Sequence, residues 1–463
     1  MPTVDILVTE IGSTTTVVNA FDGVGTPTPT FVAQGQAPTT VLDGDVTIGV
    51  KQAIEDLKKN LGVDDLSWQE MLGTSSAAGG LKMTVHGLVH DMTVKAAEDA
   101  ALGAGAVIKM ITTGKLRERQ VDEIENKKPN IILLAGGVDY GDEETILHNA
   151  EMLSKLDRSI PVIYGGNKAI RGEIKEIFAP TEMELLIVDN VYPEIDQFNI
   201  EPTREVIQDV FEDHIIYAPG MDKINDWVTG PIMPTPGAVM NGAKLLKEVI
   251  GDLIVFDVGG ATTDLHSVTD GAEEIQDILI SPEPVAKRTV EGDLGVFVNA
   301  KNVANRIGYK QLKEELGIDV ASLVEDKAPI PKNKEEERLI ERLTEEAVKV
   351  AIERHAGSFK EVYGPSGRTT IASGKDLTLV KWIIGTGGAL TQLDNNRNLL
   401  GQVRVKKARK KLFPTLNAQV LIDEDYIFAS LGVIGKEYPE AAINLMKQSL
   451  QITDDIIEKE EAK

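Results

Sequence analysis

Cysteine is absent from this chain of 463 residues. Without it, a disulfide, a thiolate nucleophile, a cysteine-bound iron–sulfur cluster and a cysteine zinc site are all excluded. The sequence also lacks any run of about 18 apolar residues, and its first residues are acidic where a secretion signal would be basic. These absences predict a cytoplasmic protein that does not associate with a membrane.

Positive charge is scarce: 48 lysines and arginines stand against 73 aspartates and glutamates, a net charge of −25. Such a chain repels phosphodiester backbones, so nucleic acid is not an expected partner. Apolar residues make up 42% of the sequence and charged residues 26%, which is typical of globular proteins and argues against disorder. At about 150 residues per domain, the length predicts roughly three domains.

Two strand–turn–strand patterns stand out among the expected elements. An apolar strand leads into EIGSTTT at Glu10–Thr16 and a β-branched strand returns, and the same order recurs around DVGGATTD at Asp257–Asp264. From residue 128 onwards, short strands alternate with helices, which predicts a parallel sheet. The other expected elements are helices at 47–59, 93–110, 143–156, 238–249 and 333–354, a helix that begins at Asp293, and strands at 31–34, 275–280, 380–384 and 421–423.

The repeated glycine turn is the most informative feature. In each copy an acid precedes a glycine by two residues and hydroxyl side chains follow, so backbone N–H groups and hydroxyls can contact phosphate oxygens. The acids, Glu10 and Asp257, would hold Mg²⁺ through water beside a polyphosphate. Either turn alone is more often only a tight hairpin, and the duplication is what favours phosphate binding. The expected phosphate-binding residues are Gly12, Ser13, Thr14, Thr15, Gly259, Gly260, Ala261 and Thr262.

A third glycine motif, IIGTGGAL at Ile383–Leu390, predicts where a nucleoside would lie. A strand that runs into bare backbone and then into a helix can bring that backbone against a flat adenosine. Glu291 and Asp293 are expected to cap a helix, and a role near the ribose or nucleotide is the second interpretation of these acids. The expected adenosine-binding residues are Gly385, Thr386, Gly387 and Gly388.

The order EIGSTTT, DVGGATTD and GTGGAL resembles the phosphate-one, phosphate-two and adenosine motifs of the actin-like ATPase superfamily. The resemblance implies an α/β fold of two related RNase H-like halves around a nucleotide cleft, with an inserted Rossmann-like βαβ segment. It also implies ATP or ADP with Mg²⁺ as ligands and slow ATP hydrolysis. Glu10, Asp257 and Asp264 are the candidates to orient the attacking water, and their order is left open. The expected domains are a first half at 1–127, the inserted segment at 128–216, a connector and helix at 217–250, a second half at 251–440 and a C-terminal helical tail at 441–463.

Within that superfamily, the sequence as a whole resembles the MutL/GlmL family. These proteins are encoded beside adenosylcobalamin-dependent mutases, such as glutamate mutase and the aminomutases, and are regarded as their reactivating factors. The resemblance implies a chaperone that releases inactivated cobalamin from such a mutase. A small-molecule kinase and a non-catalytic nucleotide-gated scaffold are the alternatives, and a homodimer is left open. The supporting stretches are TSSAAGGLKM at 74–83, LLAGGVDYGD at 133–142, PTPGAV at 234–239 and RTVEGDLGV at 288–296.

Two positions depart from the superfamily pattern. Glu10 stands where Asp is usual, and Val17 stands where many members have a lysine after the threonine run. A missing cation beside the phosphates predicts slow turnover.

Two further stretches have a structural interpretation and a functional one. The basic run KKARKK at 406–411 is usually a solvated helix face, and docking of a partner is the less favoured interpretation. The small residues between Ala429 and Gly435 predict two helices that cross closely, at a hinge between the two halves.

Overall fold

The computed structural model groups the chain into two compact units. The first, here called the two-sheet unit, contains Met1–Ala77, Lys223–Ile280 and Val285–Lys463. The second, the parallel-sheet unit, contains Ala78–Asp222 with Ser281–Pro284. The domain boundaries expected from the sequence stay predictions. The residues described are 2–76, 82–104, 106–216, 220–221, 223–326, 331–364, 367–407 and 410–453.

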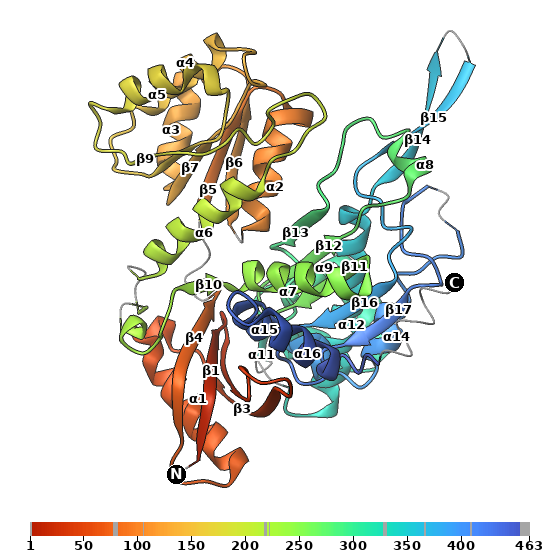
Figure 1. Ribbon diagram of the computed structural model, residues 1–463. Coiled ribbons are helices and arrows are strands. Elements are labelled where there is room, and N and C mark those ends of the chain that lie inside the picture. The colour runs from red at the N-terminus through yellow and green to blue at the C-terminus, as the bar shows by residue number, and fades with distance from the viewer. Residues whose placement is uncertain are drawn as a thin grey trace. The chain divides into compact units, whose positions relative to one another are not determined.

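Two five-stranded sheets of the same design form the two-sheet unit (Figure 1). In each sheet, three consecutive strands pair antiparallel, a later strand pairs in parallel with the first of them, and one further strand pairs in parallel with that later strand. The first sheet has β3 (Thr30–Pro38), β2 (Thr15–Asp22), β1 (Thr3–Ile11), β4 (Ser67–Ser75) and β10 (Ile232–Pro234) in that order. The second has β13 (Ala286–Glu291), β12 (Thr263–Val268), β11 (Leu253–Val258), β16 (Trp382–Thr386) and β17 (Gln419–Ile422). This duplication confirms the predicted α/β fold of two related RNase H-like halves.

Helices cover both faces of the second sheet, and the sequence of β11 shows why. Its first four residues, LIVF, are apolar on both faces: Ile254 and Phe256 pack with residues of α12 (Lys334–His355), whereas Leu253 and Val255 pack with residues of α7 (Thr235–Ile250). A strand buried on both faces is expected to be apolar throughout. The first sheet is covered by α1 (Val46–Leu61), which packs on β2 and β3.

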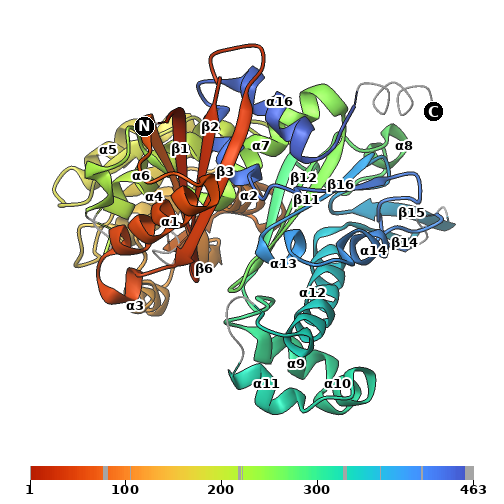
Figure 2. The same cartoon turned by 90° about the horizontal axis from the view of Figure 1, so that it is seen from below.

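The remaining elements of this unit lie around the second sheet. Figure 1 shows β14 (Ser358–Gly364) and β15 (Gly367–Ser373) as a separate ribbon, and Figure 2 shows α9, α10 and α11 beside one end of α12. The helices not yet named are α8 (Glu273–Gln276), α9 (Ala300–Ile307), α10 (Tyr309–Leu316), α11 (Val320–Asp326), α13 (Gly388–Thr391), α14 (Asn396–Gly401), α15 (Phe428–Ile434) and α16 (Pro439–Ser449).

The close helix crossing predicted near residue 430 is present between α15 and α7. A Cβ atom added to Gly432 would lie 1.8 Å from the carbonyl oxygen of Ala238, so the two backbones meet where no side chain fits. The same helix also contacts the first half, because Asn19 on β2 donates to Ser430 Oγ at 2.9 Å.

The parallel-sheet unit has five strands, all parallel, in the order β6-β5-β7-β8-β9. Numbered by chain order within the unit, this is the doubly wound order 2-1-3-4-5. The predicted alternation of strands and helices is therefore found. Its elements are β5 (Lys82–Gly87), β6 (Val107–Thr113), β7 (Ile131–Leu134), β8 (Val162–Tyr164), β9 (Leu185–Ile187), α2 (Lys95–Gly103), α3 (Glu118–Lys127), α4 (Glu144–Leu153), α5 (Arg171–Phe178) and α6 (Glu201–Ile216).

Three local predictions were wrong. The helix expected at 93–110 ends at Gly103, because the β-branched run that follows pairs with β5 as strand β6. The strand expected at 275–280 begins as α8, and Ile275 packs with Ala372 and Leu412. No helix begins at Asp293; the chain makes turns there and α9 starts at Ala300, so the capping role given to Glu291 and Asp293 is also wrong.

Some predicted features fall partly outside the described residues: 77–81 of TSSAAGGLKM, 217–219 and 222 of the connector, 408–409 of the basic run and 454–463 of the tail. Within the part of the chain that the structure describes, no helix is both long and apolar enough to cross a membrane.

Candidate functional site

The two repeated glycine turns close in the same way. Gly12 N–H donates to the Thr15 carbonyl oxygen at 2.9 Å, and Gly259 N–H donates to the Thr262 carbonyl oxygen at 2.9 Å. At the tips, the N–H groups of Ser13, Thr14, Gly260 and Ala261 donate to no group among the described residues. Each turn therefore offers backbone N–H donors at its tip, as the motif predicted.

All three glycine motifs meet within the two-sheet unit. A Cβ atom added to Gly260 would lie 3.4 Å from Thr14 Oγ1, so the tips of the two turns face each other. Gly387 has a φ of +85°, and a Cβ atom added there would lie 2.5 Å from Asp257 Oδ1. The third motif thus packs directly against the acid of the second.

The four residues predicted to bind adenosine lie in different surroundings. A Cβ atom added to Gly385 would lie 2.6 Å from Leu400 Cδ1, and Thr386 Oγ1 donates to Asp423 Oδ2 at 2.9 Å, so both residues face the core. Gly387 is buried against Asp257, whereas Gly388 is half-buried and has open space beside its Cα atom. A flat ligand can approach this motif only at its helical end.

Glu10 lies at the centre of a cluster of carboxyl groups. Burial, together with the nearby charges of Asp257 and Asp423, raises its pKa to about 8. Its Oε1 accepts a long hydrogen bond of 3.5 Å from Tyr426 Oη, and its buried Oε2 has no hydrogen-bond partner.

Asp257 and Asp264 belong to the same cluster, directly opposite each other on β11 and β12. Burial and the charge of Asp264 raise the pKa of Asp257 to about 7, although Arg288 opposes the shift. Asp264 Oδ2 lies 3.2 Å from a nitrogen of Arg288, and both side chains are buried. Burial raises the pKa of Asp264 as well, and its Oδ1 has no hydrogen-bond partner.

These carboxyl groups fit a divalent cation. Several acids buried together disfavour their ionised forms, and a cation would stabilise those forms and satisfy the unpartnered oxygens of Glu10 and Asp264. In the described ranges, no three His, Cys, Asp or Glu side chains are arranged to hold a metal ion directly. A cation here would therefore keep water molecules between itself and the carboxylates, which is the usual behaviour of Mg²⁺.

Glu291 and Asp293 are both held by Arg354 of α12. Glu291 Oε2 makes a short contact with the Arg354 guanidinium, and Asp293 Oδ1 lies 2.9 Å from Arg354 Nη1. Burial raises the pKa of Glu291, whereas the hydrogen bond from Arg354 lowers that of Asp293. The pair anchors the end of β13 to α12, next to the segment that packs on the second glycine turn.

Two residues around Glu10, Asp423 and Tyr426, were not predicted from the sequence. Asp423, at the end of β17, accepts from Thr386, Ser449 and the Phe428 N–H, and Tyr426 reaches Glu10 from the same loop. The available signal was the acid at the end of the predicted strand 421–423, the same position after an apolar run that Asp257 occupies in β11.

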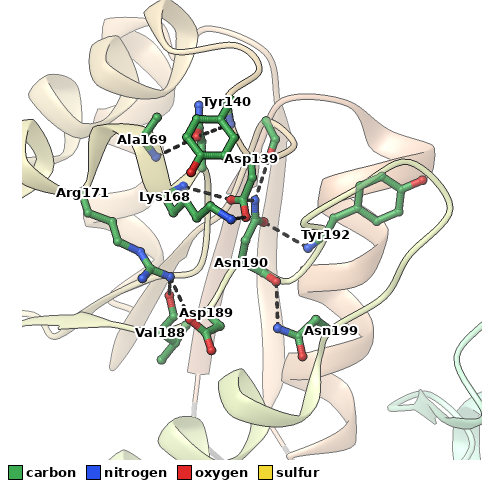
Figure 3. Close-up of polar contacts among 12 residues, drawn as sticks. Asp139, Tyr140, Lys168, Ala169, Arg171, Val188, Asp189, Asn190, Tyr192 and Asn199 are labelled. Carbon is green, nitrogen blue, oxygen red and sulfur yellow. Dashed lines mark hydrogen bonds and ion pairs between the residues drawn. The ribbon is translucent and has the colours of Figure 1, made fainter.

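In the parallel-sheet unit, the loops that follow β7, β8 and β9 are joined by a network of polar contacts (Figure 3). Asp139, after β7, accepts from Lys168 N at 3.0 Å and from Asn190 Nδ2 at 3.0 Å, and Lys168 Nζ lies 3.0 Å from Asp139 Oδ2. Arg171 donates to the Val188 carbonyl oxygen at 2.8 Å. The loops after β7, β8 and β9 are therefore braced against one another.

The duplicated fold and its three converging glycine motifs define the actin-like ATPase class of proteins. A family model described as "MutL protein" matches residues 6–450. The chain belongs to the MutL protein family. It is 37% identical to "Protein MutL" of Clostridium tetanomorphum over 426 residues, which cover 89% of this chain and 92% of that protein.

Similarity to solved structures is weaker. A nucleotide-free acetone carboxylase matches with a TM-score of 0.42 and 13% identity, over 93% of this chain and 70% of that one. A nucleotide-free diol dehydratase-reactivating factor matches with a TM-score of 0.35 and 12% identity, over 94% of this chain and 99% of that one. Neither similarity is close enough to bear on function.

Proposed function

We propose that the protein binds Mg-ATP and Mg-ADP between its two glycine turns and hydrolyses ATP slowly. The observation that carries this proposal is the convergence of both turns, the third glycine motif and the Glu10 cluster in one unit. Two turns with unpaired N–H groups suit two neighbouring phosphoryl groups. The adjacent carboxyl groups suit the cation that accompanies them.

Each part of the site has a proposed role. The tips at Gly12–Thr15 and Gly259–Thr262 bind phosphoryl oxygens, and the helical end of Gly385–Gly388 contacts adenosine. Glu10 and Asp257 hold Mg²⁺ through water, and the cation neutralises phosphate charge when bound. Glu10, Asp257 and Asp264 remain the candidates to orient the attacking water.

The process that ATP binding and hydrolysis would drive is proposed from what is known of the family. Members are regarded as reactivating factors of adenosylcobalamin-dependent mutases, so we propose that the protein releases inactivated cobalamin from a mutase or aminomutase. A nucleotide can drive that release only by as much as the ATP-bound and ADP-bound forms differ in affinity for the mutase.

Isothermal titration of the protein with Mg-ATP and Mg-ADP, repeated without magnesium, tests the nucleotide site. Binding that depends on magnesium is expected. Absence of binding in every arm would overturn the ATPase proposal. Addition of candidate small-molecule acceptors to these samples separates the alternatives, since a kinase would transfer the γ-phosphoryl group of ATP to an acceptor and release ADP, whereas a scaffold would bind ATP without turnover.

Reactivation is tested with glutamate mutase and with an aminomutase, each inactivated by turnover and then incubated with the protein, Mg-ATP and fresh adenosylcobalamin. Recovery of activity that requires ATP is expected with one of them. Nucleotide binding without recovery for either would contradict the reactivation proposal and leave the nucleotide site intact.

A further inference from the structure

We propose that Thr39 and Asn299 are positioning residues, each of which holds the backbone carbonyl groups of one glycine turn so that the N–H groups of the turn face a phosphoryl group. The inference rests on the proposed nucleotide site. Neither residue belongs to the three glycine motifs.

In the first half, Thr39 holds two carbonyl groups of the turn at Gly12–Thr15. Its Oγ1 donates to the Gly12 oxygen at 2.8 Å, and its backbone N–H donates to the Thr14 oxygen at 3.0 Å. Thr16 Oγ1 lies 3.0 Å from Thr39 Oγ1. Because the Thr39 hydroxyl donates to Gly12, the Thr16 hydroxyl must donate to Thr39, which fixes the direction of this short chain of bonds.

In the second half, the segment that ends at Asn299 holds three carbonyl groups of the turn at Gly259–Thr262. Asn299 Nδ2 donates to the Ala261 oxygen at 2.7 Å and to the Gly292 oxygen at 2.9 Å. Backbone N–H groups of the preceding residues complete the set: Val296 donates to Gly259 at 3.3 Å, and Phe297 and Val298 donate to Gly260 at 2.9 and 2.7 Å.

The two arrangements occupy equivalent places in the duplicated fold. Thr39 directly follows β3, the third strand of the first sheet, and the 292–299 segment directly follows β13, the third strand of the second. The residues differ, one being a threonine and the other an asparagine. In both halves a side chain donates to a carbonyl oxygen of the turn, through a hydroxyl group in the first half and an amide group in the second.

Peptide geometry connects these bonds to phosphate binding. In a planar trans peptide the C=O and the following N–H point in opposite directions. Holding the Gly12 oxygen therefore directs the Ser13 N–H away from Thr39, and holding the Ala261 oxygen directs the Thr262 N–H away from Asn299. Carbonyl oxygens repel phosphate, so a turn whose carbonyls are already engaged needs no rearrangement when an anion binds.

The test compares Thr39→Val and Asn299→Leu with the wild type in isothermal titration against Mg-ADP and against adenosine, which has no phosphoryl group. Each variant removes one donor at similar size. Each variant loses the one hydrogen bond that its side chain donates to the turn, and Asn299→Leu also loses the bond to the Gly292 oxygen, which lies outside the turn. Loss of the bond to the turn predicts roughly fivefold weaker binding of Mg-ADP. Adenosine affinity should be unchanged, and Thr39→Ser, which restores the hydroxyl, should recover Mg-ADP binding.

Matched controls come from the parallel-sheet unit. Thr181 Oγ1 donates to the Phe178 carbonyl oxygen at 2.8 Å, and Asn199 Nδ2 donates to the Asn190 carbonyl oxygen at 3.2 Å; both residues are half-buried, as Thr39 and Asn299 are. Thr181→Val and Asn199→Leu should lower the thermal midpoint by similar amounts without changing nucleotide affinity. If an apolar variant at the site does not fold, Thr39→Ala or Asn299→Ala replaces it.

The outcomes separate this inference from the proposed function. If the wild type binds no nucleotide, the proposed function fails and the inference fails with it. If the wild type binds Mg-ADP and both variants bind it equally well, only the inference is overturned. Equal losses for Mg-ADP and adenosine would also overturn it, because they would show a general structural role.

Discussion

Among single residues, Glu10 and Asp257 make stability depend on pH. Their pKa values are raised by burial to about 8 and about 7, so the folded protein binds protons that the unfolded chain has already lost. The free energy of unfolding contributed by these groups is therefore highest below their ordinary pKa range and falls as the pH rises through about 7 to 8.

Glu10→Gln should remove part of this dependence, because an amide cannot lose a proton. We expect the thermal midpoint of the metal-free variant to fall less between pH 5 and pH 8 than that of the wild type. Glu176→Gln, at an exposed position of α5, is the control and should behave as the wild type does. Parallel curves for the wild type and Glu10→Gln would contradict the prediction.

Asp257→Asn should weaken nucleotide binding only when magnesium is present. Loss of a carboxylate that holds a cation through water predicts about 10- to 100-fold weaker Mg-ADP binding. Without magnesium, affinity should match that of the wild type, and the thermal midpoint should not drop, since a buried charge is removed. Titration calorimetry with and without magnesium checks this, with the exposed Asp64→Asn as control. An equal loss in both conditions would indicate a structural role.

Within individual elements, the turn between β16 and α13 depends on one glycine. Gly387 has a φ of +85°, and an added Cβ atom would lie 2.7 Å from the backbone nitrogen of Val258. Gly387→Ala should therefore lower the free energy of unfolding by about 1–3 kcal/mol. Gly388→Ala, whose Cβ atom would meet nothing within 4 Å, should be neutral or slightly stabilising. Urea unfolding of both variants tests this prediction, and equal urea midpoints for Gly387→Ala and Gly388→Ala would refute it.

The crossing of α15 and α7 gives a second prediction for an element. The Cβ atom of Gly432→Ala would overlap the Ala238 carbonyl oxygen, so the helices must separate. Overpacking of this kind costs about 1–3 kcal/mol. Gly172→Ala on α5, where a Cβ atom has open space, is the control. The thermal midpoint of each variant is the measurement. A midpoint of Gly432→Ala equal to that of the wild type would show that the two helices can separate without cost.

The elements also show which features a sequence can reveal. The two hairpins and the turn after β16 were predictable, because a glycine turn between apolar strands is a local signal. The strand β6 was not, since it forms only by pairing with β5. Asp423 and Asn299 were missed because each lies more than 30 residues from the turn or acid it serves, and only folding brings them there.

Across the whole molecule, the duplicated fold predicts that the two halves move when nucleotide binds. The tips at Thr14 and Gly260 nearly touch, so phosphoryl groups cannot lie between them unless the halves shift. The contact of Asn19 with Ser430 joins the first sheet to α15, whose close packing on α7 suits a pivot.

This movement can be measured directly, because the absence of cysteine lets two introduced cysteines carry spin labels without background. Gln52→Cys on α1 and Lys349→Cys on α12 are exposed positions in opposite halves. Saturating Mg-ADP should shift the distribution of distances between the labels, whereas the same labels in the Asp257→Asn background should require higher nucleotide concentrations for the same shift. An unchanged distribution at saturation, with binding shown by calorimetry, would mean that the nucleotide binds without moving the halves. The protein would then have no means of passing the energy of ATP to a partner through movement of its halves, and the reactivation proposal would lose its physical basis.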